Sequence, residues 1–404
     1  MEPWTPERLG THVRHKKGFA FKSESLQPSG YPIVKVSNFT DGSISTEVLE
    51  YVDEQTYHEN IEYRLKSGDV VIQTVGSWPN NPNSVVGRVV RVPKNLDGAL
   101  LNQNAVIVYP DSKIDSSFLY YLLRSQNFKG YIVNTAQGAA NQASITLDSI
   151  FRFEFYLPPK HEQSNIAVIL SNYDELIENN RRRIVLLEKL AEEIYREWFV
   201  RLRFPNHDNV EFVKGLPATW ITVRLGEIAT FTMGQSPPST TYNESGDGLP
   251  FHQGVGTYGD RFPRKITFCT ANGRKARKGE ILFSVRAPVG RLNIADDEMI
   301  IGRGLAAIRQ KQGYNSYLYY LLKLAFANED IIGNGSIFNS VGKDELARFQ
   351  ILQPDEALVK AFEAHVAPID EQIAILSRSV EYLTKTRDLL VPRLISGKLS
   401  LGHL

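Results

Sequence analysis

The second half of the sequence repeats the first, and this repetition limits the possible folds more than any other feature. From Asp148 onward, matched residues keep a constant separation of 196 positions, so that Asp148 pairs with Asp344. Collinear matches of this kind identify a tandem duplication, and the chain must fold as two copies of one unit. Three of the matches, in chain order, are Arg8-Leu9-Gly10 with Arg224-Leu225-Gly226, Tyr120-Tyr121-Leu122-Leu123 with Tyr319-Tyr320-Leu321-Leu322, and Asp174-Glu175 with Asp370-Glu371.

The segments with constant separation carry a heptad pattern in both copies. Apolar residues alternate at spacings of four and three, and charged residues such as Glu178 and Arg181 lie off this line. The pattern predicts two long helices packed along an apolar seam. Pro368 predicts a break or bend near the start of the second helix, and Pro392 predicts its end within a turn. The predicted seam residues are Ile166, Leu170, Tyr173, Ile177, Ile184, Leu187, Ile194, Trp198, Ile369, Ile373, Leu376, Val380, Leu383 and Leu390.

The connection between the two helices favours an antiparallel pair. The intervening residues join the end of the first helix to the start of the second, and these two ends are adjacent only if the helices run in opposite directions. A parallel pair would require the connection to reach back about 45 Å, for ~30 residues that rise 1.5 Å each. We therefore expect an antiparallel coiled coil with the following chain divisions: a globular domain at 1–157, a helix at 158–203, a globular domain at 204–355 and a helix at 356–404.

Each globular domain is expected to mix helices and strands, which places the protein in the α+β class. Short segments rich in β-branched and aromatic residues predict strands, and two amphipathic segments predict single helices. The expected strands are Asp69–Val75, Val85–Val92, Ala105–Tyr109, Phe151–Leu157 and Glu280–Val285, and the expected helices are Ser117–Arg124 and Ser316–Leu324.

Composition and motifs exclude several classes of function. No apolar run approaches the ~18 residues of a membrane span, and Glu2, Glu7 and Arg8 occupy the place of a signal peptide's apolar stretch. We therefore expect a cytoplasmic protein without a membrane partner. The single cysteine, Cys269, excludes a multi-cysteine zinc site. No group of residues has the pattern of a catalytic or metal site, so we expect neither.

Basic residues gather in one part of a chain whose net charge is only +1. Residues 261–291 contain nine arginines and lysines and a single acidic residue, Glu280. They alternate with glycine, proline and aromatic residues in expected loops, a composition that favours phosphate binding over a merely solvated surface. Lys16 and Lys17 form a smaller cluster beside Phe19.

Loops rich in Asn, Gln and Arg predict contacts with DNA bases, because these side chains can form paired hydrogen bonds with base edges. Asn and Gly are also ordinary turn residues, so both interpretations stay open for each single loop. Within the basic run, we expect Arg274, Lys275, Arg277 and Lys278 to contact phosphates. The candidate DNA-binding residues are Lys16, Lys17, Asn80, Asn81, Asn83, Arg88, Gln137, Asn141, Gln142, Arg261, Arg264, Lys265, Arg274, Lys275, Arg277, Lys278, Arg286, Arg291, Arg303, Asn334 and Asn339.

Three further segments resemble a known family. They are Leu157-Pro158-Pro159-Lys160-His161-Glu162-Gln163 before the first helix, Glu197-Trp198-Phe199-Val200-Arg201-Leu202-Arg203-Phe204-Pro205 after it, and Pro392-Arg393-Leu394-Ile395-Ser396-Gly397-Lys398-Leu399 after the second helix. Together with the duplication, they make the whole chain similar to the specificity subunits of type I restriction-modification systems. The second copy departs from the pattern at Gln353-Pro354-Asp355-Glu356, which replaces the Leu-Pro-Pro segment.

The resemblance implies a DNA-recognition subunit with two target-recognition domains and no catalytic site. Each domain would recognise one half of a bipartite, asymmetric site in double-stranded DNA, and the helices would set the gap between the halves. Two methyltransferase subunits would methylate adenine N6 with S-adenosylmethionine, and two motor-nuclease subunits would use ATP and Mg. This chain itself would bind no cofactor.

The alternative is a free-standing, pseudo-symmetric DNA-binding regulator. Such a protein needs no apolar surface on its helices for partner subunits. The sequence places several apolar residues outside the seam or at its end, which favours a subunit of a complex: Trp198, Phe199, Ile169, Leu176, Leu186 and Leu190.

Overall fold

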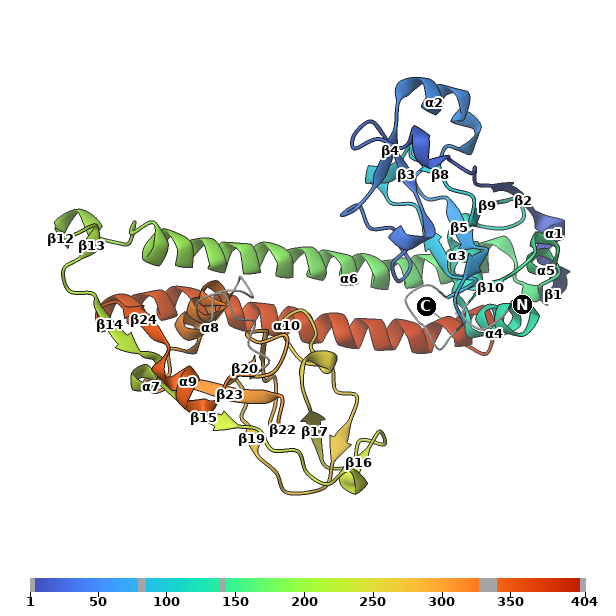
Figure 1. Ribbon diagram of the computed structural model, residues 1–404. Coiled ribbons are helices and arrows are strands. Elements are labelled where there is room, and N and C mark those ends of the chain that lie inside the picture. Colours follow the sequence, from blue (N-terminus) through green and yellow to red (C-terminus); the bar gives the residue numbers. More distant parts are fainter. Residues whose placement is uncertain (1–3, 79–84, 139–141, 327–339, 400–404) are drawn as a thin grey trace. The chain divides into compact units, whose positions relative to one another are not determined.

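Two long helices, α6 (Lys160–Tyr195) and α10 (Glu356–Ile395), each contribute to two folding units (Figure 1). The computed structural model describes residues 4–78, 85–138, 142–326 and 340–399. Unit 1 comprises residues 1–178 and 380–404, and unit 2 comprises residues 179–379. Each unit therefore takes one half of α6 and one half of α10, and the predicted duplication is confirmed by the equivalent sheets of the two units.

A four-stranded antiparallel sheet in the order β2-β9-β5-β7 forms the centre of unit 1. A second sheet has the order β4-β3-β8, and β1 pairs with β11 next to α6. The strands of unit 1 are β1 (Thr5–Arg8), β2 (Val13–Lys17), β3 (Tyr31–Val34), β4 (Glu50–Val52), β5 (Val70–Gln73), β6 (Val75–Gly76), β7 (Val89–Arg91), β8 (Leu100–Leu101), β9 (Ala105–Pro110), β10 (Ala143–Ser144) and β11 (Glu154–Leu157).

Unit 2 repeats this arrangement with the sheet β15-β23-β20-β21. Its second sheet is larger, in the order β16-β18-β17-β22-β19, and β14 pairs with β24 as β1 pairs with β11. The strands of unit 2 are β12 (Phe212–Val213), β13 (Leu216–Pro217), β14 (Ile221–Arg224), β15 (Ala229–Met233), β16 (Tyr242–Asn243), β17 (Leu249–His252), β18 (Phe268–Cys269), β19 (Lys275–Ala276), β20 (Ile281–Ser284), β21 (Leu292–Ile294), β22 (Met299–Ile301), β23 (Leu305–Gln310) and β24 (Gln350–Gln353).

The registers of the two central sheets are also equivalent. Val70 of β5 pairs with Val108 of β9, and Ile281 of β20 pairs with Ile308 of β23. The five strands and two helices predicted from residue pattern are present, although the strand β11 begins only at Glu154 because Leu147–Phe151 forms a helix. This duplication of register lets each residue of one sheet be assigned a counterpart in the other.

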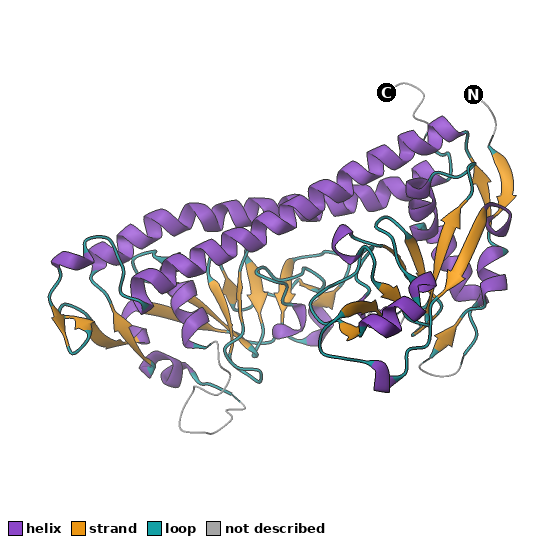
Figure 2. Ribbon diagram, turned by 90° about the horizontal axis from the view of Figure 1, so that it is seen from above, coloured by secondary structure: helices purple, strands orange, loops and turns teal. Residues whose placement is uncertain are grey.

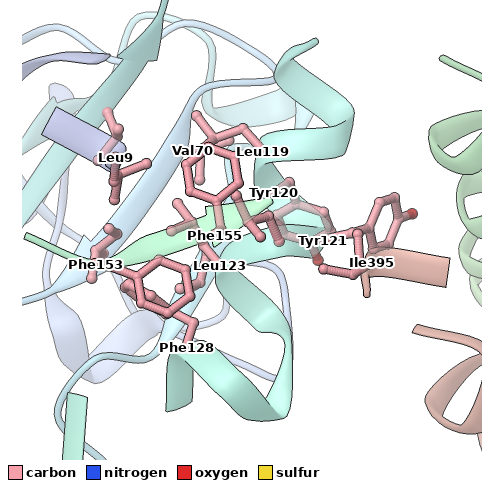
Figure 3. Packing of buried hydrophobic residues seen from close by; sticks show 14 of the residues in the cluster. Leu9, Val70, Leu119, Tyr120, Tyr121, Leu123, Phe128, Phe153, Phe155 and Ile395 are labelled. Carbon is pink, nitrogen blue, oxygen red and sulfur yellow. The ribbon is translucent and has the colours of Figure 1, made fainter. Parts of the chain in front are cut away.

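Short helices cover the sheets and bury most of their apolar side chains. In unit 1, Tyr120, Tyr121 and Leu123 of α3 pack with Phe128 of α4 and Phe153, which precedes β11 (Figure 3). Asp115 caps α3 by accepting hydrogen bonds from the backbone of Ser117 and Phe118, an interaction that stabilises such a helix by about 1 kcal/mol. The short helices are α1 (Leu9–His12), α2 (Glu54–Glu59), α3 (Ser116–Arg124), α4 (Gln126–Thr135), α5 (Leu147–Phe151), α7 (Leu225–Ile228), α8 (Asn315–Ala325) and α9 (Lys343–Arg348).

Within each unit, the halves of α6 and α10 lie side by side and the strands lie on one side of them (Figure 2). In unit 2, Asn180 donates to the Ser379 hydroxyl at 3.2 Å, and the rings of Trp198 and Phe362 are 5.9 Å apart. In unit 1, Arg387 binds Asp174 at 2.7 Å. From the first contact to the second, the residue number on the α6 side rises from 180 to 198, while that on α10 falls from 379 to 362. The two helices therefore run in opposite directions within unit 2.

Pro368 does not break α10, so the predicted break was wrong. The helix continues from Glu356 to Ile395 and ends within a turn of Pro392, as predicted. A proline inside a helix removes one hydrogen bond and strains the preceding turn. Here Val366 and Ile373 on either side of the proline are fully buried, and Val366 belongs to the core of unit 2, which offsets this cost.

The predicted seam residues of both helices are buried or half-buried in the structure. Trp198 also packs in the core of unit 2, where Phe199 joins it. In the described part of the chain, no helix is long and apolar enough to cross a membrane.

Candidate nucleic-acid interface

One end of the central sheet of unit 2 gathers three of the predicted DNA-binding arginines. Strand β20 ends at Ser284, and β23 begins next to it at Leu305. The loop 285–291 therefore lies beside the segment 302–304. Arg286, Arg291 and Arg303 come from these two segments and have exposed side chains.

The loop 285–291 is held in place by the buried hydroxyl of Ser284. This hydroxyl donates to the Pro288 carbonyl at 2.6 Å and accepts the backbone N–H of Arg291 at 2.8 Å. Gly290 has a φ of 87°, and a side chain there would meet the ring of Phe326. The backbone at Arg291 is thus fixed, as a residue that contacts a base edge requires.

Unit 1 has the same arrangement at the same end of its sheet. The Gln73 N–H donates to the Arg88 carbonyl at 2.9 Å, as the Ser284 N–H donates to the Arg291 carbonyl at 2.9 Å. Arg88 is therefore the counterpart of Arg291. Its guanidinium donates to the Phe39 carbonyl at 3.0 Å, and burial lowers its pKa. Part of the hydrogen-bonding capacity of Arg88 is therefore used within unit 1.

The basic run predicted from sequence does not form one surface. Arg277 and Lys278 precede β20, whereas Arg286 follows it, and a four-residue strand separates its two ends by about 13 Å. Lys265 lies 3.1 Å from Asp296, and Lys275 lies 2.7 Å from Glu298. The turn after Ile294 thus brings acidic residues against the run. Arg264, Arg274, Arg277 and Lys278 are exposed and, among the described residues, have no carboxylate partner.

Arg261 was wrongly predicted to contact DNA. Its side chain is only 3% exposed and forms an ion pair with Asp370 of α10. It also donates to the Tyr320 hydroxyl at 3.2 Å, and its guanidinium lies 4.6 Å from the Tyr319 ring centroid. Burial, the largest single influence, lowers the pKa of Arg261, but Asp370 together with Tyr319 and Tyr320 raises this pKa overall. Arg261 therefore joins the sheet domain to the helix.

In both units, the second tyrosine of the repeated Tyr-Tyr pair also connects the sheet domain to a long helix. This role was not predicted from the sequence. Tyr121 donates to Asp174 at 2.6 Å, and the equivalent Tyr320 donates to Asp370 at 2.9 Å. Burial, followed by the neighbouring carboxylate, raises the pKa of Tyr121. Burial is also the main cause of the raised pKa of Tyr320. The signal was present in the sequence, because both the tyrosines and the aspartates are matched pairs of the duplication.

The remaining candidates of unit 1 are dispersed. Lys17 is exposed at the end of β2, beside the start of β9, and is thus at the same sheet end as Arg88. Lys16 forms an ion pair with Glu62. Gln137 and Gln142 are exposed, and the backbone of Gln137 pairs with Ser144. Six candidates lie outside the described residues: Asn80, Asn81, Asn83, Asn141, Asn334 and Asn339.

A buried histidine near this sheet end makes the stability of unit 2 sensitive to acid. His252 is fully buried and contacts the Thr257 hydroxyl at 2.8 Å through Nδ1. Burial and the charge of Lys265 lower its pKa to about 4. Below its ordinary pKa of ~6.5 the unfolded chain binds a proton that the folded chain excludes, so stability falls between about pH 6.5 and 4.

Replacing this histidine should make unit 2 less sensitive to acid. We expect His252→Asn to remove roughly 2–3 kcal/mol of the decrease in stability between neutral and acidic pH, because the asparagine binds no proton. The measurement is urea unfolding at pH 7 and at pH 4.5. An equal decrease in both proteins would contradict the assignment.

The described residues contain no cluster of histidine, cysteine or acidic side chains suited to hold a metal ion. The exposed groups at the sheet ends are instead cations and amides, which can bind phosphate oxygens and base edges.

Comparison with known proteins assigns this fold to a family. A family model, described as the type I restriction modification DNA specificity domain, matches residues 1–189 and 217–373. A relative from Methanocaldococcus jannaschii, described as a type I restriction enzyme MjaX specificity subunit, is 31% identical over 98% of this chain and 94% of its own length. The HindI specificity subunit of Haemophilus influenzae is 22% identical over 83% of this chain and 87% of its own length.

A solved structure has the same fold. The crystal structure of the type I restriction-modification S subunit from M. genitalium has a TM-score of 0.66 at 19% identity, and covers 97% of this chain and 96% of that one. The chain therefore belongs to the family of type I restriction-modification DNA specificity subunits. It recognises DNA sequence as a non-catalytic part of such a system, and the interpretation as a free-standing regulator is set aside.

Proposed function

We propose that each unit recognises one half of a bipartite, asymmetric site in double-stranded DNA through the end of its central sheet. The observation that carries this proposal is the equivalence of the two sheet ends. They share backbone geometry, including the pairs Gln73–Arg88 and Ser284–Arg291, but carry different side chains around it. One scaffold with two sets of side chains suits two different half-sites.

The helices α6 and α10 act in this proposal as an antiparallel coiled coil that sets the gap between the half-sites. The antiparallel contacts within unit 2 support this role, as does the hydrogen bond between the buried Asn180 and the half-buried Ser379. A buried polar side chain in an apolar seam favours one register over others, because any slip leaves it without its partner.

The outward faces of the helices are the proposed docking surfaces for partner subunits. Ile169, predicted to lie there, is half-buried against the core of unit 1, and Trp198 and Phe199 belong to the core of unit 2. Other apolar side chains are exposed at 46–66%, and these are available to partners: Leu176, Leu186, Leu190, Ile375, Tyr382 and Leu389. The duplication offers two equivalent surfaces, which suits two methyltransferase and two motor-nuclease subunits. S-adenosylmethionine, ATP and Mg would bind to those subunits and not to this chain.

Two measurements test the proposal. Mass measurement of the purified complex should find two methyltransferase copies for each copy of this chain. Selection from random duplex DNA by that complex should yield two short, different blocks separated by a fixed gap. One partner copy for each chain, or a selected pool without sequence preference, would contradict the proposal.

The exposed cations of unit 2 that have no carboxylate partner among the described residues should strengthen binding to any DNA sequence. We expect the triple variant Arg274→Ala, Arg277→Ala and Lys278→Ala to bind specific and random duplexes more weakly by similar factors. The slope of log affinity against log salt should fall by about 0.9 for each phosphate that the variant no longer binds. The matched control is Lys265→Ala with Lys275→Ala, because these lysines are already paired with carboxylates. An equal effect of the control would remove the distinction between paired and unpaired cations.

A further inference from the structure

Three backbone segments cross at this end of each central sheet with almost no space between them. In unit 2, a Cβ added to Gly234 would lie 2.1 Å from the Gly302 carbonyl oxygen, and one added to Gly304 would lie 2.5 Å from the Gln253 carbonyl oxygen. Both distances are far below van der Waals contact. The segments 234–236, 252–254 and 302–304 therefore form one rigid crossing.

The same crossing occurs in unit 1. A Cβ added to Gly18 would lie 2.0 Å from the Asn102 carbonyl oxygen. Three backbone hydrogen bonds of unit 1 have counterparts in unit 2. In unit 1 the N–H groups of Gly18, Phe19 and Asn102 donate to the carbonyls of Ala105, Leu101 and Val34, respectively. In unit 2 the N–H groups of Gly234, Gln235 and Gly302 donate to the carbonyls of Leu305, Ile301 and His252, respectively.

These bonds define which residues occupy equivalent positions. Gln235, Gln253 and Arg303 of unit 2 correspond to Phe19, Lys35 and Gln103 of unit 1. Five of the six side chains are exposed, and Lys35 is half-buried beside Glu50. A repeated backbone crossing thus presents chemically different groups in the two units.

Gln253 has a defined conformation. Its side chain lies over Gly302, where an added Cβ would be 2.4 Å from Oε1. The Ser236 hydroxyl donates to this Oε1 at 2.8 Å and accepts the Arg303 N–H at 3.2 Å. Among the residues that the structure describes, no other group binds Gln253 Oε1 or Nε2, so one lone pair and both amide protons stay available for a ligand. Arg303 is exposed and has no carboxylate partner among the residues that the structure describes.

We propose that Arg303 and Gln253 contact base edges in the half-site of unit 2, and that Ser236 is a positioning residue for Gln253. The proposal rests on DNA recognition by the sheet ends. An arginine fork matches guanine O6 and N7, and a glutamine amide matches adenine N6 and N7. The Gly304 N–H donates to the Gln253 carbonyl at 3.1 Å, so the two side chains come from adjoining backbone and would contact neighbouring base pairs.

Selection from a random duplex library, with the chain bound to its methyltransferase partner, tests the inference. Arg303→Ala should lose preference for one guanine in one half-site, and Gln253→Leu for one adenine, each by about 10- to 100-fold. Ser236→Ala should weaken the preference only at the adenine, and adding it to Gln253→Leu should cause no further loss. The other half-site should keep its preferences in every variant.

Arg274→Ala is the matched control, because it removes an exposed arginine of the same unit and should lower affinity without changing the selected motif. Arg303→Gln replaces the arginine fork with an amide, which matches adenine and not guanine, so it should lose the guanine preference even if Arg303→Ala folds poorly. If the wild type selects a bipartite motif and Arg303→Gln and Gln253→Leu select the same motif, the inference is wrong and the proposed function stands. If the wild type selects no motif, the proposed function itself fails.

Discussion

Arg261→Ala should destabilise unit 2 by about 3–5 kcal/mol, because it leaves the largely buried carboxylate of Asp370 without its cationic partner. Arg261 is 3% exposed and Asp370 is 16% exposed at its side chain. The substitution also removes the guanidinium from the face of Tyr319 and a donor from the Tyr320 hydroxyl. The measurement is urea unfolding at pH 7, monitored by a spectroscopic probe that lies in unit 2.

The control is Arg264→Ala, three residues further on. Its side chain is exposed, and removing an exposed cation usually changes stability by less than about 0.5 kcal/mol. If Arg261→Ala unfolded like the control and instead reduced only DNA affinity, Arg261 would belong to the DNA-binding surface as the sequence suggested.

Removing one heptad from each long helix should reduce binding to the original DNA site at least about 100-fold. Residues 181–187 of α6 and 372–378 of α10 are the pair to delete, because both deletions preserve the heptad phase and flank Asn180 and Ser379. Seven helical residues span about 10 Å, which equals about three base pairs of straight DNA.

The shortened protein should therefore prefer a smaller gap and keep the same bases in each half-site. Selection from a library with variable gaps measures both properties at once. A control deletion of the heptad from α6 alone should disrupt the seam and lower stability as well. Altered base preference in the paired deletion, with an unchanged gap, would show that the helices do not set the spacing.

The duplication made the fold largely predictable from sequence. Matched segments such as Tyr120–Leu123 and Tyr319–Leu322 recur as the equivalent helices α3 and α8, and the heptad residues are buried or half-buried along the two long helices. Both follow from local periodicity, which the sequence contains directly. Pro368 was misjudged because local propensity expects a break, while packing on both sides of the proline keeps α10 continuous.

The candidate site was less predictable, because surfaces depend on contacts between distant residues. The count of basic residues ended at Arg291 and therefore missed Asp296 and Glu298, which fold back onto Lys265 and Lys275. Arg261 stood in a basic, glycine-rich run, and nothing near it in sequence indicated the pairing with Asp370.

The positions at the backbone crossing required the register of the sheets. Gln235 and Gln253 stand outside the basic run of the sequence, and their counterparts Phe19 and Lys35 differ from them chemically. The paired hydrogen bonds at the crossing, those of Gly18 with Gly234 and of Asn102 with Gly302, identify these positions as equivalent.

Sequencing of methylated bases in cells with and without this gene, in the presence of its methyltransferase partner, tests the central claim most directly. The account predicts N6-methyladenine in one motif of two different short blocks with a fixed gap, which disappears when the gene is removed. A continuous motif, two identical half-sites or methylation that is independent of the gene would contradict recognition by two units that share one fold but carry different side chains at their sheet ends.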